Sequence, residues 1–402
     1  MSGQRRILLL ASGASSYGAD RMLLMSVRAL LGAGHDVLVA FPGTGPLVAQ
    51  VSQAGAGTVV LPDFGLRRHD LHPIKLLSLA RRQFQTLRWL RAEHRRAPFH
   101  LVYSNTQTVA VGPVLRRLLA VPHLWHVHEI LVRPRWMARL LAWAARHGAD
   151  RVVCVSRSVE HHLIDLDPGL SSRTQVILNG IELTDMAAVD PPSPAMPLRL
   201  GCVARLHHWK GQDVLIQAVA LARREVPVEL TLFGDVYPGN EHVRRRLEQL
   251  VARLGVQEVV RFAGFEADWT RIYPTIDVCV VPSTDPEPFS LATVEAQACA
   301  RPVIASRLGG PAEIVVDGAS GLLVEPRSPE QLAKAIVQLA RSPRLIEELG
   351  VTGRARALRE FSRSRFDREI QDAAAALLPI SLSDRALAHS VDSKPLVQAE
   401  RR

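Results

Sequence analysis

The sequence predicts an α/β protein built from two Rossmann-like domains, and three observations support this prediction. Short apolar runs rich in β-branched residues alternate with helix-periodic stretches along most of the chain, as in parallel sheets covered by helices. The 402 residues, 47% of them apolar, are enough for two hydrophobic cores. A proline-rich linker at residues 191–197 divides the chain. We therefore place the first domain at residues 1–190, the second at 191–378 and a disordered tail at 379–402.

The amino-terminal apolar run is predicted to be a first strand rather than a targeting segment. It follows Arg5-Arg6 and stops at Ser12, which is too short for a signal peptide. No apolar run approaches the roughly 18 residues needed to cross a bilayer. The four cysteines lack C-x-x-C spacing and are predicted to be reduced core residues. We expect a cytoplasmic protein that also makes peripheral contact with the inner face of the membrane.

The net charge of +10 is distributed unevenly along the chain. Residues 1–190 hold 22 Lys and Arg against 13 Asp and Glu, whereas residues 191–402 hold 27 against 26. Nearly all the excess positive charge therefore lies in the first half. This distribution predicts an anionic partner for that half, such as a phosphorylated lipid, a membrane surface or an acidic polymer.

The first half begins with a β-loop-α-β pattern. A strand at residues 6–11 is followed by the loop S-G-A-S-S-Y-G-A-D, a helix at 21–33 and a strand at 37–41. The loop does not match G-x-G-x-x-G, so it supports dinucleotide binding only weakly, and a tight turn without a ligand is the alternative. Further strands are predicted at 57–61, 99–104, 123–127, 151–155 and 174–178.

His128 is the candidate functional residue of the first half. It follows the predicted strand at 123–127, and ligands of open α/β sheets bind at the carboxyl ends of strands. Two alternatives remain at this point. His126 and His128 could form a metal pair, although no third ligand is evident, or His128 could be a buried histidine satisfied by its neighbours.

The second half begins with a strand at residues 198–204, which is followed by Arg205-Leu206-His207-His208-Trp209-Lys210-Gly211 and a helix. Arg205 and Lys210 would be unfavourable at a helix N-terminus unless an anion binds there, because the helix dipole is positive at that end. A pyrophosphate group would satisfy both cations. The alternative is an exposed basic loop.

Residues 276–326 carry two carboxylates in a β-loop-α-β pattern. Ile276–Val281 is predicted to be a buried strand, and a helix is predicted to start near Ser290. Glu287 precedes this helix and Glu295 lies inside it among small residues, which indicates close packing. A buried carboxylate needs hydrogen-bonding partners, and ligand hydroxyls could supply them. The alternative is a surface glutamate and a salt-bridged one.

The motif P-S-x-x-x-E-P-F-S-x-x-x-x-E-A, followed by P-V-I-A-x-x-x-G-G-x-x-E, resembles the carboxyl-terminal signature of family 4 glycosyltransferases. These are retaining enzymes with the GT-B fold, in which two Rossmann-like domains face each other across a central cleft and the last helix crosses back to the first domain. Arg205 and Lys210 match the R-x-x-x-x-K-G element of the family. Ser290 stands where the family often has glycine.

The resemblance implies a role for each matched residue. The implied catalytic residues are His128, Glu287, Arg205 and Lys210. The implied donor-binding residues are Gly18, Ala19, Arg205, Lys210, Gly234, Ser290, Leu291, Glu295, Gly309 and Gly310. By resemblance Glu295 holds the donor ribose, Glu287 holds the sugar hydroxyls and His128 contacts the transferring sugar. No metal and no cofactor is expected, since the nucleotide sugar is a substrate.

The resulting expectation is a metal-independent enzyme that moves a sugar from a nucleoside-diphosphate sugar to an acceptor with retention of configuration, with a lipid-linked or envelope glycan as the favoured acceptor. A polyanion- or nucleic-acid-binding protein is the non-enzymatic alternative, although no specific nucleic acid is expected as a partner. A glycoside hydrolase also needs two carboxylates, but it has no use for paired cations at a helix N-terminus.

Residues 67–96 are the candidate acceptor-side surface. They hold nine basic residues against Asp70 and Glu93. Leu76, Leu77, Ala80, Phe84, Leu87 and Leu90 recur at helical spacing. One interpretation is a core-packed helix with a solvated basic side. The other is a peripheral contact with an anionic membrane, and the nearby Arg133, Arg135 and Arg139 beside Trp136 and Trp143 favour it.

Overall fold

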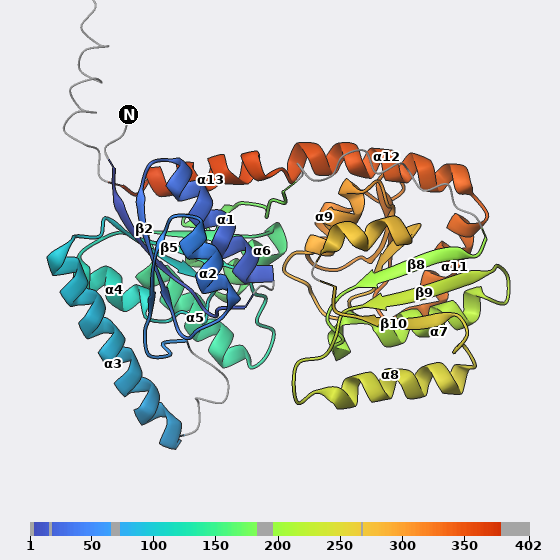
Figure 1. The fold of residues 1–402 in the computed structure, drawn as a ribbon, viewed down its shortest axis with the longest axis horizontal. Helices are drawn as coiled ribbons and strands as arrows, with labels where there is room; N and C mark the ends of the chain where they lie inside the picture. Colours follow the sequence, from blue (N-terminus) through green and yellow to red (C-terminus); the bar gives the residue numbers. More distant parts are fainter. Residues whose placement is uncertain (1–3, 16–17, 66–72, 183–195, 267, 379–402) are drawn as a thin grey trace, which may run out of the picture. The chain divides into compact units, whose positions relative to one another are not determined.

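The computed structural model describes residues 4–15, 18–65, 73–182, 196–266 and 268–378, and these contain two parallel sheets flanked by helices (Figure 1). The predicted α/β class with two Rossmann-like sheets is confirmed. The chain divides into two compact units, one of Met1–His126, Trp143–Val152 and Asp367–Arg402, and the other of Val127–Ala142 and Val153–Phe366. The predicted linker prolines at 191–194 and the predicted tail at 379–402 lie outside the described residues.

The first sheet has the strand order β3-β2-β1-β4-β5-β6-β7. Its central strand β1 is apolar throughout Ile7–Leu10 and fully buried there, as expected for a parallel strand covered on both faces. The strands are β1 (Arg6–Leu10), β2 (Asp36–Phe41), β3 (Gly57–Val60), β4 (Leu101–Asn105), β5 (His123–Val127), β6 (Arg151–Cys154) and β7 (Thr174–Val176). The helices between them are α1 (Gly18–Gly32), α2 (Pro46–Gln53), α3 (Pro73–Arg96), α4 (Gly112–Leu119), α5 (Arg135–Gly148) and α6 (Arg157–Leu166).

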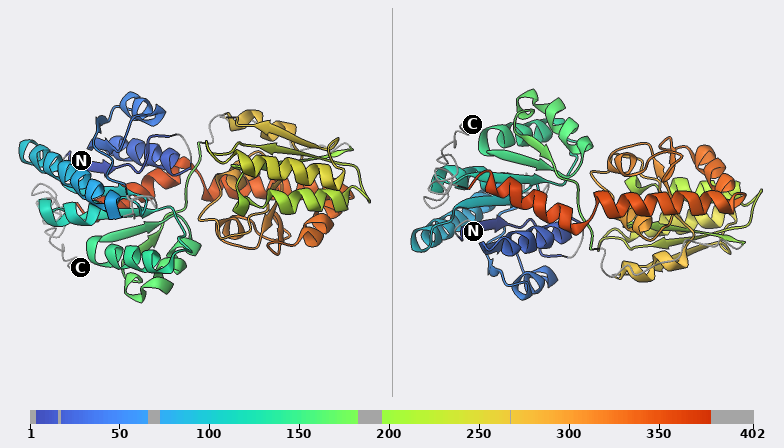
Figure 2. Two further views of the ribbon diagram at one scale, coloured as in Figure 1. Left: turned by 90° about the horizontal axis from the view of Figure 1, so that it is seen from below. Right: turned by 90° about the horizontal axis from the view of Figure 1, so that it is seen from above.

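The second sheet has the order β10-β9-β8-β11-β12-β13. Its strands are β8 (Leu198–Val203), β9 (Val228–Phe233), β10 (Val260–Gly264), β11 (Val278–Val281), β12 (Val303–Ser306) and β13 (Gly321–Val324). Its helices are α7 (Gln212–Ala222), α8 (Glu241–Leu254), α9 (Leu291–Ala298), α10 (Gly310–Ile314), α11 (Pro329–Ala340) and α12 (Pro343–Glu360). The last helix is α13 (Arg363–Ala375), whose residues from Asp367 onward belong to the unit of the first sheet. There the Gln371 side chain donates to the Ala29 carbonyl at 2.8 Å. Helices lie on both faces of each sheet in the two views of Figure 2.

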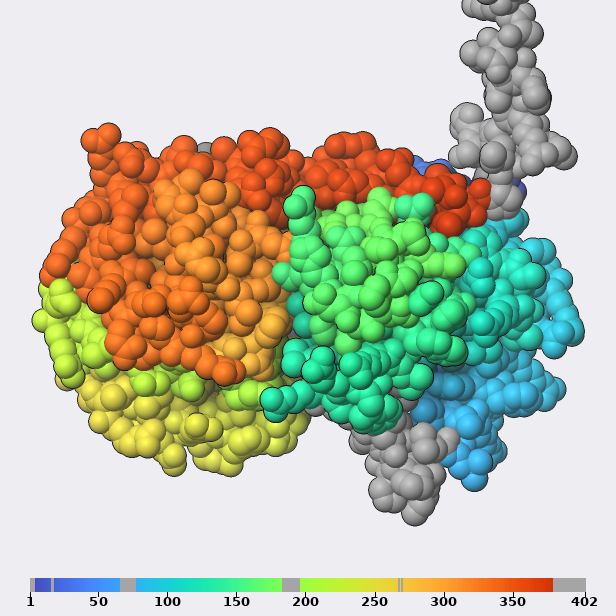
Figure 3. All heavy atoms as spheres, turned by 180° about the vertical axis from the view of Figure 1, so that it is seen from behind, coloured from blue at the N-terminus to red at the C-terminus, as the bar shows by residue number. Residues whose placement is uncertain are grey.

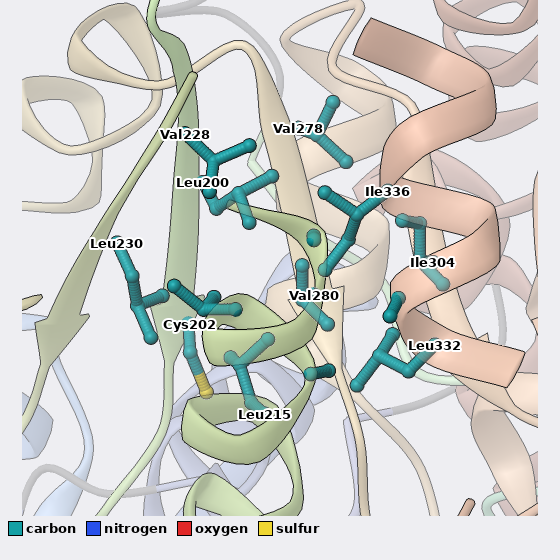
Figure 4. Packing of buried hydrophobic residues seen from close by; sticks show 14 of the residues in the cluster. Leu200, Cys202, Leu215, Val228, Leu230, Val278, Val280, Ile304, Leu332 and Ile336 are labelled. Carbon is teal, nitrogen blue, oxygen red and sulfur yellow. The ribbon is translucent and has the colours of Figure 1, made fainter. Parts of the chain in front are cut away.

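The core of the second sheet lies between its strands and the helices α7 and α11. Leu215 of α7 and Ile336 of α11 are fully buried, and they pack with strand residues such as Leu200 and Val280 (Figure 4). The apolar positions of both helices recur every three or four residues, so each helix turns one continuous stripe toward the sheet. This packing fixes the start of α7, and therefore the loop that precedes it.

In each sheet the chain reverses its direction of travel beside the first strand. After β3 it returns to place β4 next to β1, and after β10 it returns to place β11 next to β8. Such a point opens a crevice outside the carboxyl ends of the two neighbouring strands, where ligands of doubly wound folds bind. In the second sheet the segments leaving these ends are residues 204–211 and 282–290, which carry the candidate residues.

The apolar stripe predicted for α3 is only partly a core face. Leu90 is buried, but Leu77 is 79% exposed and Phe84 is 65% exposed. The core-packed interpretation is therefore wrong for these two side chains, because they point to solvent beside the arginines. Among the described residues no helix is long and apolar enough to span a membrane.

An ion pair with a buried carboxylate and a half-exposed guanidinium joins β8 to the segment that enters β11. The Asp277 carboxylate is fully buried and accepts hydrogen bonds from the Arg199 guanidinium at 2.6 and 3.0 Å and from the Arg199 amide at 2.9 Å. We expect Asp277→Ala to lower the free energy of unfolding by about 2 kcal/mol, because these donors lose a buried acceptor. Urea denaturation measures the loss. Glu348→Ala, which breaks the exposed pair with Arg344, is the control and should cost about 0.5 kcal/mol or less; equal losses would contradict the prediction.

Candidate active site

Lys210 lies directly before the N-terminus of α7, as predicted. Residues 208–210 form a 3-10 turn, and Gly211 connects this turn to α7 with φ at +71°. A Cβ atom at Gly211 would lie 1.9 Å from the Pro282 carbonyl oxygen, so only glycine fits. The turn is also pinned where the Thr284 amide donates to the Trp209 carbonyl at 2.8 Å. The loop after β11 therefore packs against the turn that carries Lys210 and fixes its position.

Lys210 and Glu287 form an ion pair. The Lys210 Nζ lies 2.5 Å from Glu287 Oε1, and the Ser283 hydroxyl donates to Glu287 Oε2 at 2.7 Å. Both charged side chains are largely buried, and the Lys210 ammonium also lies 4.3 Å from the centre of the Trp209 ring. The sequence assigned these two residues to different parts of a ligand, and the structure pairs them with each other.

Arg205 is oriented by an aromatic ring. Its guanidinium lies 3.4 Å from the centre of the Tyr237 ring, which comes from the loop after β9. This distance is within the range of a cation–π interaction. Gly234 begins the same loop, and its amide donates to the Gly264 carbonyl at 2.7 Å. Its φ of +131° and the closeness of the Ala204 carbonyl exclude a side chain at this position.

The Gly309-Gly310 segment packs on the backbone of Glu287. The Gly310 amide donates to the Glu287 carbonyl at 2.7 Å. At Gly309, with φ at +66°, a Cβ atom would lie 2.5 Å from that same carbonyl oxygen. The two glycines therefore allow the loop after β12 to approach the loop that carries Glu287. Because the Gly310 amide already donates to Glu287, we expect it to shape the loop rather than to donate to a ligand.

Glu295 lies inside α9 and is 3% exposed. The Tyr273 hydroxyl donates to Glu295 Oε2 at 3.1 Å. Burial raises the pKa of Tyr273, and the Glu295 charge raises it further, so this hydroxyl stays protonated and able to donate. Ser290 caps the helix, because its hydroxyl accepts from the Thr293 amide at 3.3 Å, and Leu291 is the first helical residue. The predicted helix start is confirmed.

His128 follows the carboxyl end of β5, as predicted. Its amide donates to Glu129 Oε2 at 3.1 Å. Desolvation lowers the pKa of His128 to about 3, so the imidazole is neutral at physiological pH. Its neighbour His126 is buried, with Nδ1 2.6 Å from the Tyr103 hydroxyl. Within the described ranges no group of three or more His, Cys, Asp or Glu is placed to hold a metal ion.

Gly18 and Ala19 lie at the beginning of α1. Gly18 is the first helical residue, and the Ala19 carbonyl accepts a hydrogen bond from the side-chain Nδ2 of Asn105 at 3.1 Å. Asn105 is the last residue of β4, so this bond ties the start of α1 to the carboxyl edge of the sheet. Gly18 and Ala19 therefore lie near the carboxyl end of β4.

The structure gathers the candidate residues of the second sheet at the carboxyl ends of its central strands. Three supporting residues were missed by the sequence analysis, namely Ser283, Tyr237 and Tyr273. Ser283 belongs to the P-S-x-x-x-E motif, and this position was the only signal for it. Tyr237 contacts Arg205 from an irregular loop, and Tyr273 contacts Glu295 from a three-residue 3-10 turn. Neither segment is long enough for a periodic pattern to predict these contacts.

Glu313 is a further residue whose role appears only in the structure. It lies in α10, and its carboxylate accepts hydrogen bonds from the Arg157 and Ser158 amides at 2.8 and 2.6 Å. These are the first two amides of α6, which no residue within the helix can satisfy. A carboxylate at this end also complements the helix dipole. Glu313 therefore caps a helix that lies 155 residues earlier in the sequence.

Two family models match the chain. The model described as Glycosyltransferase Family 4 matches residues 17–185, and the model described as Glycosyl transferases group 1 matches residues 197–342.

Individual proteins are similar over much of their length. A D-inositol 3-phosphate glycosyltransferase of Kribbella flavida is 31% identical over 322 residues, which cover 72% of this chain and 73% of that protein. A GDP-mannose-dependent alpha-(1-6)-phosphatidylinositol monomannoside mannosyltransferase of Mycolicibacterium smegmatis is 32% identical over 62% of this chain and 68% of its own length. The crystal structure of Anabaena HepE in complex with UDP-glucose has a TM-score of 0.78 and 25% identity, over 92% of this chain and all of that one.

The ion pair of Lys210 and Glu287 predicts a strong coupling between the two side chains. Lys210→Met should lower the free energy of unfolding by about 3 kcal/mol, because it leaves a buried carboxylate without its cation. Adding Glu287→Gln should restore most of this loss, since the remaining partner is then neutral. Chemical denaturation of wild type, the two single variants and the double variant gives the four free energies of a double-mutant cycle. Additive effects of the two substitutions would show that the pair does not contribute as a unit.

Proposed function

The chain belongs to the family 4 and group 1 glycosyltransferases, and we propose that it transfers a sugar from a nucleoside-diphosphate sugar to an acceptor with retention of anomeric configuration. Its two parallel-sheet α/β domains match the GT-B fold. One observation carries the proposal for the donor. Two cations, Arg205 and Lys210, precede the N-terminus of α7, and Lys210 is paired with the buried carboxylate of Glu287. A glycoside hydrolase or a polyanion-binding protein would not need this arrangement.

Arg205 and Lys210 would stabilise the diphosphate as it leaves. Breaking the bond between sugar and phosphate places negative charge on the departing nucleoside diphosphate, and preorganised cations lower the energy of that state. Tyr237 and Trp209 support the two cations with aromatic rings, so little reorganisation is needed when the charge develops. HepE was crystallised in complex with UDP-glucose, which supports a donor of this class.

The two glutamates would hold different parts of the donor. Glu295, fixed by Tyr273, would accept hydrogen bonds from the ribose hydroxyls. Glu287 would accept them from the hydroxyls of the sugar, with its orientation set by Ser283 and Lys210. The neutral His128 would contact the transferring sugar without adding a charge that competes with the leaving group. The Gly309-Gly310 loop and the start of α9 would shape the surface around the phosphates. Gly18, Ala19 and Gly234 are the other residues proposed to bind the donor.

We propose that the reaction needs no metal ion and no cofactor. In many glycosyl transfers a divalent cation neutralises the diphosphate, and here Arg205 and Lys210 would supply that charge.

The proposed acceptor is a lipid-linked or envelope glycan, met at the inner face of the membrane. The basic side of α3 would make peripheral contact with anionic lipid, because each exposed arginine near such a surface contributes about 1 kcal/mol. The exposed Leu77 and Phe84 lie on the same helix. The mycolicibacterial relative is described as acting on a phosphatidylinositol mannoside, which supports an acceptor with a lipid anchor.

The leaving-group role predicts large losses of transfer. Lys210→Ala should lower kcat by about two orders of magnitude, because one preorganised charge at a developing anion contributes about 3 kcal/mol. Arg205→Ala should behave in the same way. Initial rates with a nucleoside-diphosphate sugar measure both, and Arg341→Ala, on the exposed surface of the second sheet's unit, is the control. Rates within threefold of wild type would remove both cations from the mechanism.

The different roles of the glutamates predict different binding defects. Glu295→Ala should weaken the binding of the free nucleoside diphosphate, whereas Glu287→Ala should leave that binding near wild type and impair sugar transfer. Titration calorimetry with UDP and GDP separates the two effects, because neither ligand carries the sugar. Equal losses of affinity in both variants would mean that the assigned roles are wrong.

A further inference from the structure

The helix α5 exposes a row of large apolar side chains. Trp136 is 58% exposed, Leu140 is 50% exposed and Trp143 is 55% exposed. Their spacing of four and three residues places them on one face of the helix, which we call the α5 ridge. The opposite face, with Met137, Ala138, Leu141, Ala142 and Ala145, is buried. Two exposed tryptophans on a well-packed helix indicate a surface that contacts a partner.

The charged residues of α5 itself are all basic. Arg135 and Arg139 are exposed on the same side of the helix. The sequence contains no Asp or Glu between Glu129 and Asp150. Tryptophan beside arginine is the composition of helices that lie in a membrane interface, where the ring sits at the headgroup level and the cation meets lipid phosphate.

Two helices that pack near α5 also expose apolar side chains. Gly148, at the end of α5, lies so close to α4 that a Cβ atom there would be 2.3 Å from the Pro113 side chain. Val114 and Leu118 of α4 are both exposed. The helix α4 in turn contacts α3, which exposes Leu77 and Phe84. Figure 3 shows from behind how the teal and blue parts of the chain, which include these helices, reach the surface.

We propose that the α5 ridge inserts into the interface of an anionic phospholipid bilayer. The inference deepens the proposed function, because it rests on the membrane contact proposed for α3 and adds an apolar anchor to it. Charge on α3 alone would hold the protein above the headgroups, and salt would screen that attraction. Burial of Trp136, Leu140 and Trp143 adds a contribution that salt does not weaken.

A second copy of this chain fits the ridge less well. A symmetric contact through α5 would bring Arg135 and Arg139 of both copies into one interface, and α5 has no carboxylate to pair with them. Like charges brought together in an interface oppose association. A bilayer that contains anionic lipid accepts the apolar side chains and neutralises the arginines at the same time.

The test uses the full chain and sedimentation with vesicles of phosphatidylglycerol and phosphatidylcholine, compared with phosphatidylcholine alone. The ridge variant is Trp136→Gln, Leu140→Gln and Trp143→Gln together. Its matched control is Val351→Gln with Leu358→Gln, two exposed apolar residues on α12. A third variant changes Arg81, Arg88 and Arg91 of α3 to Gln. Thermal unfolding verifies that each variant is folded.

We expect the ridge variant to partition into anionic vesicles at least about tenfold more weakly than wild type, with the control unchanged. The α3 variant should lose affinity mainly at low salt. Brominated phosphatidylcholine in the vesicles should quench the tryptophan emission of wild type, which tests insertion without any substitution, and the ridge variant should lose this quenching.

The outcomes separate this inference from the proposed function. Equal partitioning of the ridge variant and wild type, or no quenching by brominated lipid, would overturn the inference. Absence of vesicle binding together with a dimer that the ridge variant loses would assign the ridge to a second copy. Sugar transfer without membrane binding would leave the proposed reaction intact and remove the inference. If the protein binds membranes through the ridge but binds no nucleotide sugar, the inference would stand and the proposed reaction would be removed.

Discussion

Glu287 is the residue on which the arrangement of the candidate site depends. Its carboxylate binds Lys210 and Ser283, and its backbone carbonyl accepts the Gly310 amide. Three loops, which follow β8, β11 and β12, therefore meet at one residue. Each loop leaves a different strand of the second sheet, so the order β8-β11-β12 in that sheet brings them together. The strand order places the three loops side by side, and the contacts of Glu287 hold them together.

The ion pair also has an electrostatic consequence for ligand binding. A buried carboxylate beside a site for a diphosphate would repel it, and Lys210 offsets this repulsion before any ligand arrives. Ligand phosphate and Glu287 would then share the Lys210 ammonium, which has three donors. Glu295 needs no cation of this kind, because a neutral hydroxyl from Tyr273 holds it. The two glutamates are thus suited to different neighbours, one to a charged group and one to hydroxyls.

The sequence predicted those features that have a regular spacing or a fixed composition. The strand at 123–127 agrees with the structure residue by residue, and the helix expected to start near Ser290 begins at Leu291, because an apolar run marks the strand and a capping residue marks the helix start. The pairing of Lys210 with Glu287 could not be predicted, since it depends on how two loops separated by 77 residues pack together. The exposure of Leu77 and Phe84 could not be predicted either, because an apolar stripe has the same spacing whether its side chains are buried or exposed.

Two kinds of positive charge serve two different demands in this chain. Lys210 is largely buried, and a charge in such a place acts strongly over a few ångströms and is little affected by salt. The arginines of α3 and α5 are exposed, and their combined field reaches farther into the solvent but is screened by salt. A desolvated lysine suits a small ligand that must be held in one position. An exposed basic surface with tryptophans suits a broad anionic partner that needs no single geometry. Under the proposed function, the uneven distribution of charge along the sequence would follow from these two partners.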